Sequence, residues 1–424
     1  MARKMKDSGI EWIGMIPDGW NVVKCKFITQ FINGFAFDSN DFVNQYQYAV
    51  VRIGNIDEGT IKFDDMVGVN FNEGLEAYQI KKNDILLAMS GATVGKVGMF
   101  LDDRIAYINQ RVGIIRSTNS RFLFYCLSTT TFIEYVLLGA SGTAQPNIST
   151  KMFGEYKVCE PSASEQQRIA NFLDAKCASI DGVIAKTNES IEEYKKLKQA
   201  VITEAVTKGV RGKRPMKDSG SVWFGKIPSD WNMVKFKHII HIRKDIAGTE
   251  GYTVLSITQR GIIPKDLSKN EGQLASDYSN YQLVDVGDFA MNHMDLLTGW
   301  VDISKYNGVT SPDYRVFVLN DSRVSYAKYY LYLVQMCYMD RIFYSLGQGV
   351  SGFGRWRLPA DQFLNFLVAT PSFDEQREIA DYLDSKCAAI DTLISKKQQF
   401  IDELTAYKKS LIYEYVTGKK EVPA

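Results

Sequence analysis

Two glycine-rich motifs in this sequence have residue types that could bind phosphate. GATVGKV at 91–97 resembles a phosphate-binding loop, but its glycine spacing is one residue short. Val97 stands where such a loop needs Ser or Thr, so a magnesium ion would lack its hydroxyl ligand. Gly347, Gly349 and Gly352 match G-x-G-x-x-G, but they follow a predicted helix, whereas the dinucleotide motif follows a strand. Both motifs therefore predict turns and not nucleotide sites.

The histidines and cysteines do not form a recognisable metal or catalytic set. His238 and His241 have a spacing that occurs in metal sites, but no cysteine or carboxylate set accompanies them. The six cysteines are scattered, which favours reduced thiols in a cytosolic protein. We also find no nucleophile elbow, paired carboxylates or methyltransferase-type motif. The sequence therefore predicts a protein with no catalytic residues and no metal of its own.

Length and composition describe a globular protein of several domains. The chain has 424 residues, 45% of them hydrophobic and 23% charged. It contains no apolar run long enough to span a membrane, and its polar beginning does not resemble a signal peptide. Its 50 Lys and Arg balance 49 Asp and Glu, for a net charge of +1. If the chain binds DNA, local patches or partner proteins must therefore supply the contacts to phosphate.

Two internal repeats divide the chain into two copies of one unit. The segment MKDSGIEWIGMIPDGW at 5–20 returns as MKDSGSVWFGKIPSDW at 216–231. The segment PSASEQQRIANFLDAKCASID at 161–181 returns as PSFDEQREIADYLDSKCAAID at 371–391. The period of about 210 residues is far longer than that of any solenoid repeat. The chain is therefore a tandem duplication of an opening segment, a variable domain and a long helix.

The second segment of each copy predicts a long helix that forms a coiled coil. Ser162 with Glu165, and Ser372 with Glu375, match the S-x-x-E capping box. Apolar residues then recur every seven positions in two rows, which is the pattern of a coiled-coil seam. The rows are Leu173, Ile180, Thr187, Tyr194, Val201 with Cys177, Ile184, Ile191, Lys198, Ala205, and Leu383, Ile390, Lys397, Leu404, Leu411 with Cys387, Ile394, Ile401, Lys408, Tyr415. Each helix is about 60 Å long at 1.5 Å per residue, and the two are expected to pair.

Lys198 and Lys408 interrupt the seam at the same position in both helices. A polar residue there is typical of register control, or of a lysine whose stem packs on the seam, rather than of a binding site. The alternative for the whole pattern is that each stripe packs only on its own domain. Each stripe is too long for one small domain to cover.

The two variable domains differ widely in sequence but keep common positions. Asp84, Gly95 and Arg111 have the same mutual spacing as Asp288, Gly299 and Arg315. Short strand-like runs surround these positions, whereas residues 89–94 and 109–110 differ from their counterparts 293–298 and 313–314. Loops on a rigid scaffold are where specificity usually resides. We therefore expect two homologous α+β domains with divergent loops.

The duplicated opening segment and the duplicated P-S-x-x-E-Q-x-x-I-A-x-x-L-D-x-K-C helix start resemble the DNA-specificity subunit of type I restriction–modification systems. The resemblance covers essentially the whole chain. It implies an α+β fold with two homologous target-recognition domains, separated by two long antiparallel coiled-coil helices in a pseudo-twofold tandem duplication. The corresponding segments here are 1–160 and 212–370 for the recognition domains, and 161–211 and 371–424 for the helical regions.

The resemblance also implies a function and partners. The subunit itself is not an enzyme, and it reads a bipartite, asymmetric site on double-stranded DNA, with the helices as the spacer ruler. It assembles with two adenine-N6 methyltransferase subunits and with restriction subunits that translocate DNA. S-adenosylmethionine, ATP and Mg²⁺ are expected on those partners, and no cofactor in this chain. A cytoplasmic location and no membrane are expected.

Base reading is predicted in the loops that differ between the two domains. Arg suits guanine, Asn and Gln suit adenine, Asp suits cytosine, and Ser and Thr suit several bases. The candidates are Ser90, Thr93, Lys96, Asn109, Gln110 and Arg111 in the first domain, and His293, Asp295, Thr298, Arg315, Gln348 and Arg355 in the second. Any one of them could instead be a surface residue or a buried hydrogen-bonding residue. The equivalent positions of Arg111 and Arg315 favour a structural or phosphate role for these two.

Partner binding is predicted on the helix face that is repeated beside the seam. Its residues are Glu165, Gln166, Ile169 and Ala170, with Glu375, Gln376, Ile379 and Ala380. Repetition outside the coiled-coil seam suggests that the same partner is met twice, although helix capping explains part of it. A function from a different class also accounts for the repeats and the missing catalysis. It is a non-catalytic coiled-coil scaffold whose two domains bind proteins or small ligands.

Overall fold

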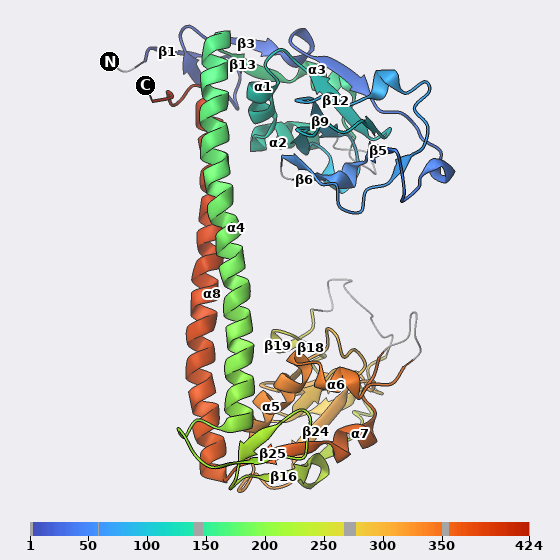
Figure 1. The fold of residues 1–424 in the computed structure, drawn as a ribbon, viewed down its shortest axis with the longest axis vertical. Coiled ribbons are helices and arrows are strands. Elements are labelled where there is room, and N and C mark those ends of the chain that lie inside the picture. The colour runs from blue at the N-terminus through green and yellow to red at the C-terminus, as the bar shows by residue number, and fades with distance from the viewer. Residues whose placement is uncertain (1–2, 58, 140–146, 267–276, 350–355, 424) are drawn as a thin grey trace. The chain divides into compact units, whose positions relative to one another are not determined.

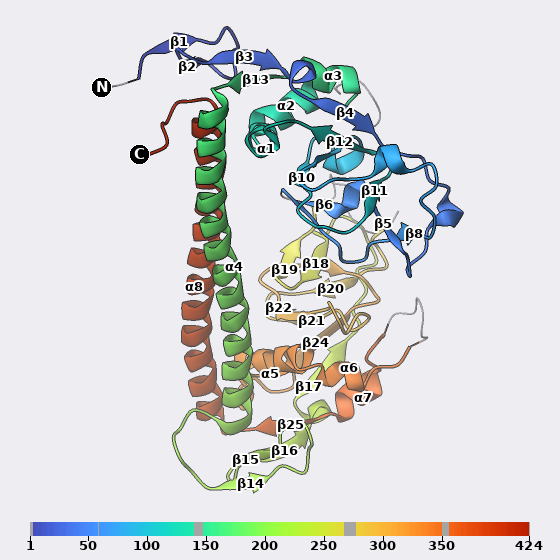
Figure 2. The ribbon, with the colours of Figure 1, turned by 45° about the horizontal axis from the view of Figure 1, so that its top comes forward.

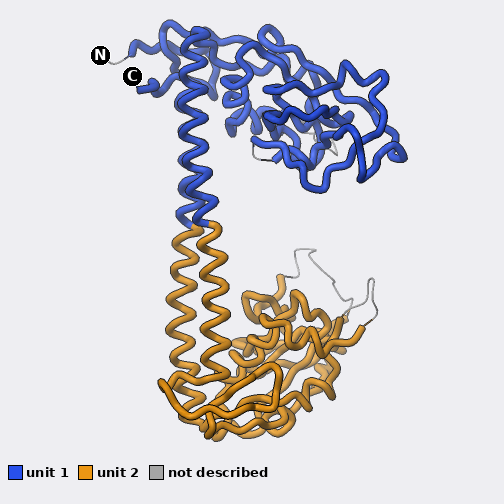
Figure 3. Tube along the Cα trace, viewed as in Figure 1, with its two compact units in different colours: residues 1–187, 399–424 blue, residues 188–398 orange. Residues whose placement is uncertain are grey.

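The computed structural model describes residues 3–57, 59–139, 147–266, 277–349 and 356–423. The chain divides into two compact units, unit 1 with residues 1–187 and 399–424, and unit 2 with residues 188–398 (Figure 3). Each unit combines one α+β domain with half of each of two long helices, α4 (Ala163–Lys208) and α8 (Phe373–Val416). The predicted duplication of an α+β domain followed by a long helix is confirmed.

Each unit begins with a two-stranded antiparallel ribbon from the duplicated opening segment. The strands are β1 (Met5–Asp7) with β2 (Met15–Pro17), and β14 (Met216–Asp218) with β15 (Lys226–Pro228). Trp20 and Trp231 follow these ribbons and are 1% and 0% exposed. An indole buries a large apolar area, so these two tryptophans anchor the opening segments to the cores of their units.

The following strand of each opening segment pairs with the strand that precedes the long helix. The antiparallel pairs are β3 (Asn21–Lys24) with β13 (Lys157–Glu160), and β16 (Asn232–Lys235) with β25 (Leu367–Thr370). The first and last strands of each domain therefore lie side by side, and the chain leaves the domain directly into α4 or α8 (Figure 2). This arrangement places each helix start against the tryptophan of its own opening segment.

The same four-stranded antiparallel sheet stands at the centre of both domains. Its strand order is β10-β9-β12-β4 in unit 1 and β22-β21-β24-β17 in unit 2. The strands are β4 (Gln30–Asn33), β9 (Ile85–Ala88), β10 (Val97–Met99), β12 (Val112–Arg116), β17 (Ile240–Arg243), β21 (Phe289–Met291), β22 (Val301–Ile303) and β24 (Arg315–Leu319). The spacing kept in the sequence therefore corresponds to equivalent strands.

The remaining elements differ more between the domains (Figure 1). Unit 1 adds the sheet β11-β5-β8 and the hairpin β6–β7, and unit 2 adds the hairpin β18–β19 and the pair β20–β23. The bounds are β5 (Tyr48–Val51), β6 (Ile56–Asp57), β7 (Thr60–Ile61), β8 (Gly68–Val69), β11 (Ala106–Ile108), α1 (Ser120–Leu127), α2 (Thr130–Gly139), α3 (Thr150–Glu155), β18 (Leu255–Thr258), β19 (Gly261–Pro264), β20 (Gln282–Val284), β23 (Gly308–Thr310), α5 (Ala327–Met339), α6 (Ile342–Ser345) and α7 (Ala360–Asn365).

A buried aspartate fixes the turn before the central strand in both domains. Asp84 accepts a hydrogen bond from the backbone N–H of Lys81 at 2.7 Å and pairs with Arg116 at 2.9 Å. Asp288 accepts from the N–H of Asp285 at 2.9 Å and pairs with Arg243 at 2.6 Å. A buried carboxylate requires such compensation. The aspartate is kept in both copies, but its arginine comes from a different strand in each.

The long helices pair antiparallel in both units, as predicted. In unit 1 Phe172 stacks near Tyr415 with ring centroids 4.6 Å apart, and Asp181 bonds Lys408 at 2.6 Å. Residue numbers therefore rise along α4 as they fall along α8. In unit 2 the contacts Lys397–Tyr194 and Asp391–Lys198 show the same direction. Gly209 and Gly418, with φ of +73° and +70°, follow the helix ends as the predicted stops.

The two seam lysines are ion-paired across the helix pair. Lys198 contacts Asp391 at 2.7 Å and Lys408 contacts Asp181 at 2.6 Å. Each lysine and aspartate of one pair is 210 residues from its counterpart in the other. A one-turn slip would break both pairs, so these contacts agree with register control, which is one of the two roles predicted from their place in the seam.

The capping boxes form only in part. The N–H of Glu165 donates to the Ser162 hydroxyl at 3.3 Å, and that of Glu375 to Ser372 at 3.4 Å. The glutamate side chains do not return to the cap. Glu165 Oε2 accepts from the indole N–H of Trp20 at 2.9 Å, and Glu375 Oε2 from that of Trp231 at 3.1 Å. Each repeated glutamate therefore joins its helix to the repeated tryptophan of the opening segment.

Burial argues against partner binding for six of the eight residues that were predicted to bind partner subunits. The apolar members of the face and both polar members in α8 are at most 2% exposed, and they contact their own unit. They are Ile169, Ala170, Glu375, Gln376, Ile379 and Ala380. Gln376 Oε1 accepts from the N–H of Tyr326 at 2.7 Å. Gln166 is half-buried and donates to the carbonyl of Pro161. The repetition reflects the same intramolecular joint built twice.

Candidate nucleic-acid interface

In unit 1 the predicted reading residues lie on turns that meet at one end of the central sheet. The N–H of Met89, at the end of β9, donates to the carbonyl of Arg111 at 2.9 Å. The N–H of Ile148 donates to the carbonyl of Met89, also at 2.9 Å. Ser90 forms an isolated bridge with Asn147. Backbone bonds thus hold the turns 89–94 and 109–111 and residues 147–148 together.

The side chains on these turns differ in access. Gln110 and Arg111 are exposed and Asn109 is half-buried. The hydroxyls of Ser90 and Thr93 are buried, and neither has a hydrogen-bond partner among the described residues. Exposed amide and guanidinium groups suit contact with base edges or phosphate. The structure therefore leaves Asn109, Gln110 and Arg111 as the accessible candidates of unit 1.

Lys96 lies beside the hairpin β6–β7 and is already paired. Its Nζ lies 3.3 Å from Asp57 Oδ1, and Asp57 also pairs with Lys62. The hydrogen bond from Lys62 is the main cause of the lowered pKa of Asp57; burial opposes it, and the hydrogen bond from Lys96 lowers the pKa further. To contact a DNA phosphate, Lys96 would have to give up its ion pair with the Asp57 carboxylate.

Unit 2 repeats the arrangement of turns. The N–H of Leu358 donates to the carbonyl of His293 at 2.9 Å, as Ile148 does to Met89. The backbones of Gln348 and Arg357 exchange hydrogen bonds of 2.8 and 3.0 Å. Gln348 is exposed, which fits the prediction made for it. Arg355, also predicted to read bases, lies outside the described residues.

The carboxylate of Asp295 is occupied by its own turn. It accepts the N–H groups of Leu297 and Thr298 at 3.0 Å each, and the hydroxyl of Thr298. Burial opposes ionisation, but these hydrogen bonds keep the pKa of Asp295 below its usual value. A Cβ at Gly299 would lie 2.0 Å from the carbonyl of Asp295, so the turn requires glycine there. Asp295 and Thr298 thus shape this turn.

The burial of Arg315 contradicts base reading by this residue and agrees with the structural role that its equivalent position favours. The residue is 4% exposed, and its Nη2 donates to the carbonyl of Leu358 at 2.9 Å. Its guanidinium lies over the ring of Phe363, 4.8 Å from the centroid. Burial lowers the pKa of Arg315 to about 10. A side chain covered in this way cannot reach base edges in a DNA groove. Its hydrogen bond to Leu358 instead holds the segment 356–358 in place.

His293 lies on the same buried side of unit 2. Its Nδ1 is buried and has no hydrogen-bond partner among the described residues. Burial, followed by the nearby charges of Arg315 and Arg357, lowers the pKa of His293 to about 3. The imidazole is therefore neutral at pH 7. Its equivalent in unit 1 is Met89, which confirms that the position lies in the apolar part of the turn.

The hairpin β18–β19 presents residues that the sequence reasoning missed. Gln259 and Arg260 form its tip and are exposed. The side-chain amide of Gln259 donates to the carbonyl of Thr298 at 3.3 Å, which places the tip beside the candidate reading turn. The sequence VLSITQRGIIP, two apolar runs around a short turn with glycine, is a hairpin signal. It could have revealed the tip, but it has no marked counterpart in the first copy.

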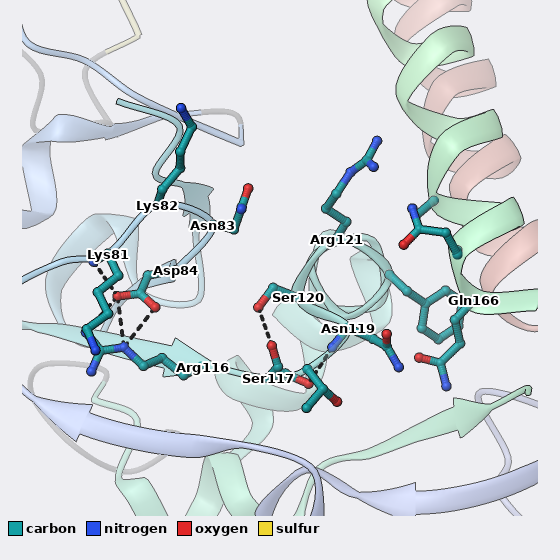
Figure 4. A pocket seen from close by; sticks show the side chains of 14 residues that line it. Lys81, Lys82, Asn83, Asp84, Arg116, Ser117, Asn119, Ser120, Arg121 and Gln166 are labelled. Atoms are coloured by element: carbon teal, nitrogen blue, oxygen red, sulfur yellow. Dashed lines mark hydrogen bonds and ion pairs between the residues drawn. The ribbon is translucent and has the colours of Figure 1, made fainter. Parts of the chain in front are cut away.

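A groove of about 390 Å³ lies in unit 1 between the domain and the start of α4 (Figure 4). Lys81, Lys82, Arg116 and Arg121 line it together with serine, asparagine and glutamine side chains. Its charges are largely satisfied internally. Arg116 pairs with Asp84, Lys82 with Asp103, and Arg121 with Asp174. The groove therefore offers few unpaired charges to a ligand.

The described residues show no arrangement for catalysis or metal binding. No group of three His, Cys, Asp or Glu in the described ranges could hold a metal ion. The six cysteines are free and buried, and burial raises the pKa of the Cys25 thiol to about 12. A thiol of this kind is unreactive at neutral pH. Within the same ranges no single helix has both the length and the apolar composition of a membrane span, and only the bent pair α1–α2 passes that test jointly.

Comparison with known proteins gives consistent matches. The family model described as "Type I restriction modification DNA specificity domain" matches residues 17–193. The MjaVIII type I restriction enzyme specificity subunit of Methanocaldococcus jannaschii is 26% identical over 81% of this chain and 80% of its own length. The EcoKI specificity subunit of Escherichia coli is 22% identical over 70% of this chain and 63% of its own length.

One solved structure shares the fold over nearly the whole chain. It is described as showing complex assembly and conformational transition of the type I R-M system. The match has a TM-score of 0.69 with 16% identity, and it covers 96% of this chain and 99% of that one. At this identity the likeness concerns the fold alone. It supports the order of elements described above, with two α+β domains and two long helices.

Proposed function

Because the chain belongs to the family of type I restriction–modification DNA-specificity subunits, we propose that it reads a bipartite, asymmetric site on double-stranded DNA. Each unit reads one half-site. The observation that carries this proposal is the shared four-stranded sheet with unlike turns at its end. One scaffold presents Asn109, Gln110 and Arg111 in unit 1 and Gln348 in unit 2. Unlike side chains on like scaffolds produce an asymmetric site.

The helices set the distance between the half-sites in this proposal. α4 has 46 residues and α8 has 44. At 1.5 Å per residue each is about 65–70 Å long, which exceeds one DNA turn of about 34 Å. The seam ion pairs support a fixed register along the pair. A helix pair with one register is suited to act as a ruler.

An insertion tests the ruler role. Four residues added near Asn188 lengthen that helix by about 6 Å. The preferred spacer between the half-sites should change while both half-sites persist. The matched control is the same insertion in the exposed turn around Gly248, which should leave the spacer unchanged. An unchanged spacer in a folded, active complex with the helix insertion would refute the ruler role.

Partner subunits carry the chemistry in this proposal. Two adenine-N6 methyltransferase subunits would bind S-adenosylmethionine, and restriction subunits would use ATP and Mg²⁺. Because six of the eight residues of the repeated E-Q-x-x-I-A face are buried, we place the main partner contacts on another surface. The exposed apolar residues beside the seam support the helix pair as one such place. They are Val183 and Leu197 in α4, and Leu393, Phe400 and Tyr407 in α8, each at least 41% exposed.

Sequencing of methylated motifs in a host that expresses this chain with its methyltransferase subunit tests the proposed function. We expect one bipartite motif with a fixed spacer. Binding to randomised DNA by the purified complex should recover the same motif. The alternative, a coiled-coil scaffold with two protein- or ligand-binding domains, predicts no sequence-dependent retardation of DNA. No enriched motif in either experiment would reject DNA recognition.

A further inference from the structure

The hairpin β18–β19 of unit 2 is a short, rigid two-stranded ribbon. Thr258 pairs with Gly261, so that Gln259 and Arg260 alone form the turn. The Thr258 hydroxyl accepts the N–H of Arg260 at 3.1 Å and donates to the carbonyl of Gly261 at 2.9 Å. Gly261 has φ of +106°, and a Cβ there would lie 2.6 Å from a carboxylate oxygen of Asp302. The turn is therefore fixed both by its threonine and by its glycine.

The tip leaves one cationic side chain available. Gln259 is occupied by the carbonyl of Thr298, which ties the tip to the turn 292–299. The guanidinium of Arg260 is exposed and makes no hydrogen bond or ion pair with the residues that the structure describes. By contrast, Arg243 and Arg323 in the same unit pair with aspartates. Arg260 thus combines a fixed backbone with a free five-donor group.

The hairpin β6–β7 of unit 1 uses other charged residues. Asp57 of β6 pairs with Thr60 of β7 across the ribbon. The Asp57 carboxylate is paired with Lys62 and Lys96. Unit 2 therefore presents an arginine at its hairpin turn, whereas unit 1 has an aspartate that is paired with two lysines. Unlike side chains on the two hairpins are suited to discriminate between half-sites.

We infer that the β18–β19 hairpin enters the major groove of the half-site read by unit 2, and that Arg260 reads a guanine there. This inference rests on the proposed function. A two-stranded ribbon fits the major groove, and an arginine fork donates to O6 and N7 of guanine. The tie between Gln259 and Thr298 places the ribbon next to the turn that the sequence comparison singles out. Arg260 is thereby a specificity-determining residue.

Selection from randomised DNA by the full chain with its methyltransferase subunit tests this role. Arg260→Ala should lose the preference for one guanine in one half-site and leave the other half-site unchanged. Affinity for the preferred site should fall about 5- to 150-fold, the range for one bidentate pair. Arg260→Lys keeps the charge and a donor but not the planar fork, so it should weaken the same preference less than Arg260→Ala does. Arg323→Ala, an exposed but paired arginine, is the control and should select the wild-type motif.

The outcomes separate this inference from the proposed function. A wild-type chain that selects no motif would overturn both. A wild-type chain that selects a bipartite motif, with Arg260→Ala selecting the same motif, would overturn only the reading role of Arg260. An Arg260→Ala variant that selects the wild-type motif but binds all sequences more weakly would assign the residue to phosphate and also overturn the reading role. Thermal melting of each variant establishes that the turn substitution leaves the chain folded.

Discussion

Arg111 of unit 1 and Arg315 of unit 2 occupy equivalent positions, yet they have different surroundings. Arg111 is exposed on the turn before β12. Arg315 is 4% exposed, donates to the carbonyl of Leu358 and lies over Phe363. The shared spacing therefore places both arginines at the start of equivalent strands, and it does not decide how each side chain is used. In this molecule the strands are duplicated, but side chains at equivalent positions make different contacts.

A second comparison concerns the joint between domain and helix. Glu375 is 1% exposed and binds Trp231 and Arg214. Glu165 makes the same contacts with Trp20 and Arg3, but its side chain is 17% exposed. The glutamate–tryptophan–arginine contact of unit 2 is thus less accessible to water than that of unit 1. The charge that holds it together has less access to compensating water.

Removing these two glutamates should have the largest effect on stability. Glu375→Ala leaves the buried Trp231 N–H without its acceptor and removes the closest carboxylate from Arg214, which keeps only the Lys208 carbonyl and Asp230. Breaking this largely buried pair should cost about 3–5 kcal/mol. Glu165→Ala removes a partly hydrated pair and should cost about 1.5–3 kcal/mol. Chemical denaturation monitored by tryptophan fluorescence measures both. Equal losses would contradict the difference in burial between the joints.

Acid should destabilise unit 2 more than unit 1. Burial lowers the pKa of His293 to about 3, whereas an unfolded histidine titrates near 6.5. The unfolded chain therefore binds the proton first, so this stability is complete above about pH 6.5 and is lost as pH falls towards 3. His293→Met, which installs the residue of unit 1, should remove this dependence, worth a few kcal/mol. Melting curves between pH 7 and pH 4 test it, and an unchanged pH profile would count against a neutral buried imidazole.

Alanine substitutions at Arg315 and Arg111 should affect different quantities, namely folding stability for Arg315 and DNA binding for Arg111. Arg315→Ala leaves the Leu358 carbonyl without its donor and should cost about 1.5–3 kcal/mol of folding free energy. Arg111→Ala should leave stability unchanged. If Arg111 contacts phosphate, its loss should weaken binding to all DNA sequences similarly and lower the salt slope by about one. Loss of stability in Arg111→Ala would show that Arg111 has a structural role despite its exposure.

The seam ion pairs should give the smallest effect, and the same one in both units. The Lys198–Asp391 and Lys408–Asp181 pairs are partly exposed, with lysine side chains 31% and 25% accessible. Double-mutant cycles to alanine should give coupling energies of about 0.2–1 kcal/mol for each pair. Coupling that differed strongly between the two would mean that the helix pair departs from its internal symmetry.

The sequence by itself determined the architecture. The two repeats predicted the duplication, and the seven-residue rows predicted the helix pair. For Lys198 and Lys408 the pattern left register control and a packed stem open, and their ion pairs agree with register control. These features depend on contacts between nearby positions or on a periodic pattern, and both are visible in the order of residues. The spacing of Asp84 and Asp288 likewise predicted equivalent strands, because the distance along the chain is kept.

Only the tertiary structure decided how individual polar side chains are used. Glu165 and Glu375 match a capping pattern, but their carboxylates bind tryptophans about 145 residues away. Arg315 matches a base-reading residue type, but Leu358 and Phe363, brought over it by the fold, bury it. Arg260 was not found because its importance comes from the neighbouring turn at Thr298. Residue type states which bonds a side chain is able to make, and burial and long-range neighbours decide which of them it makes.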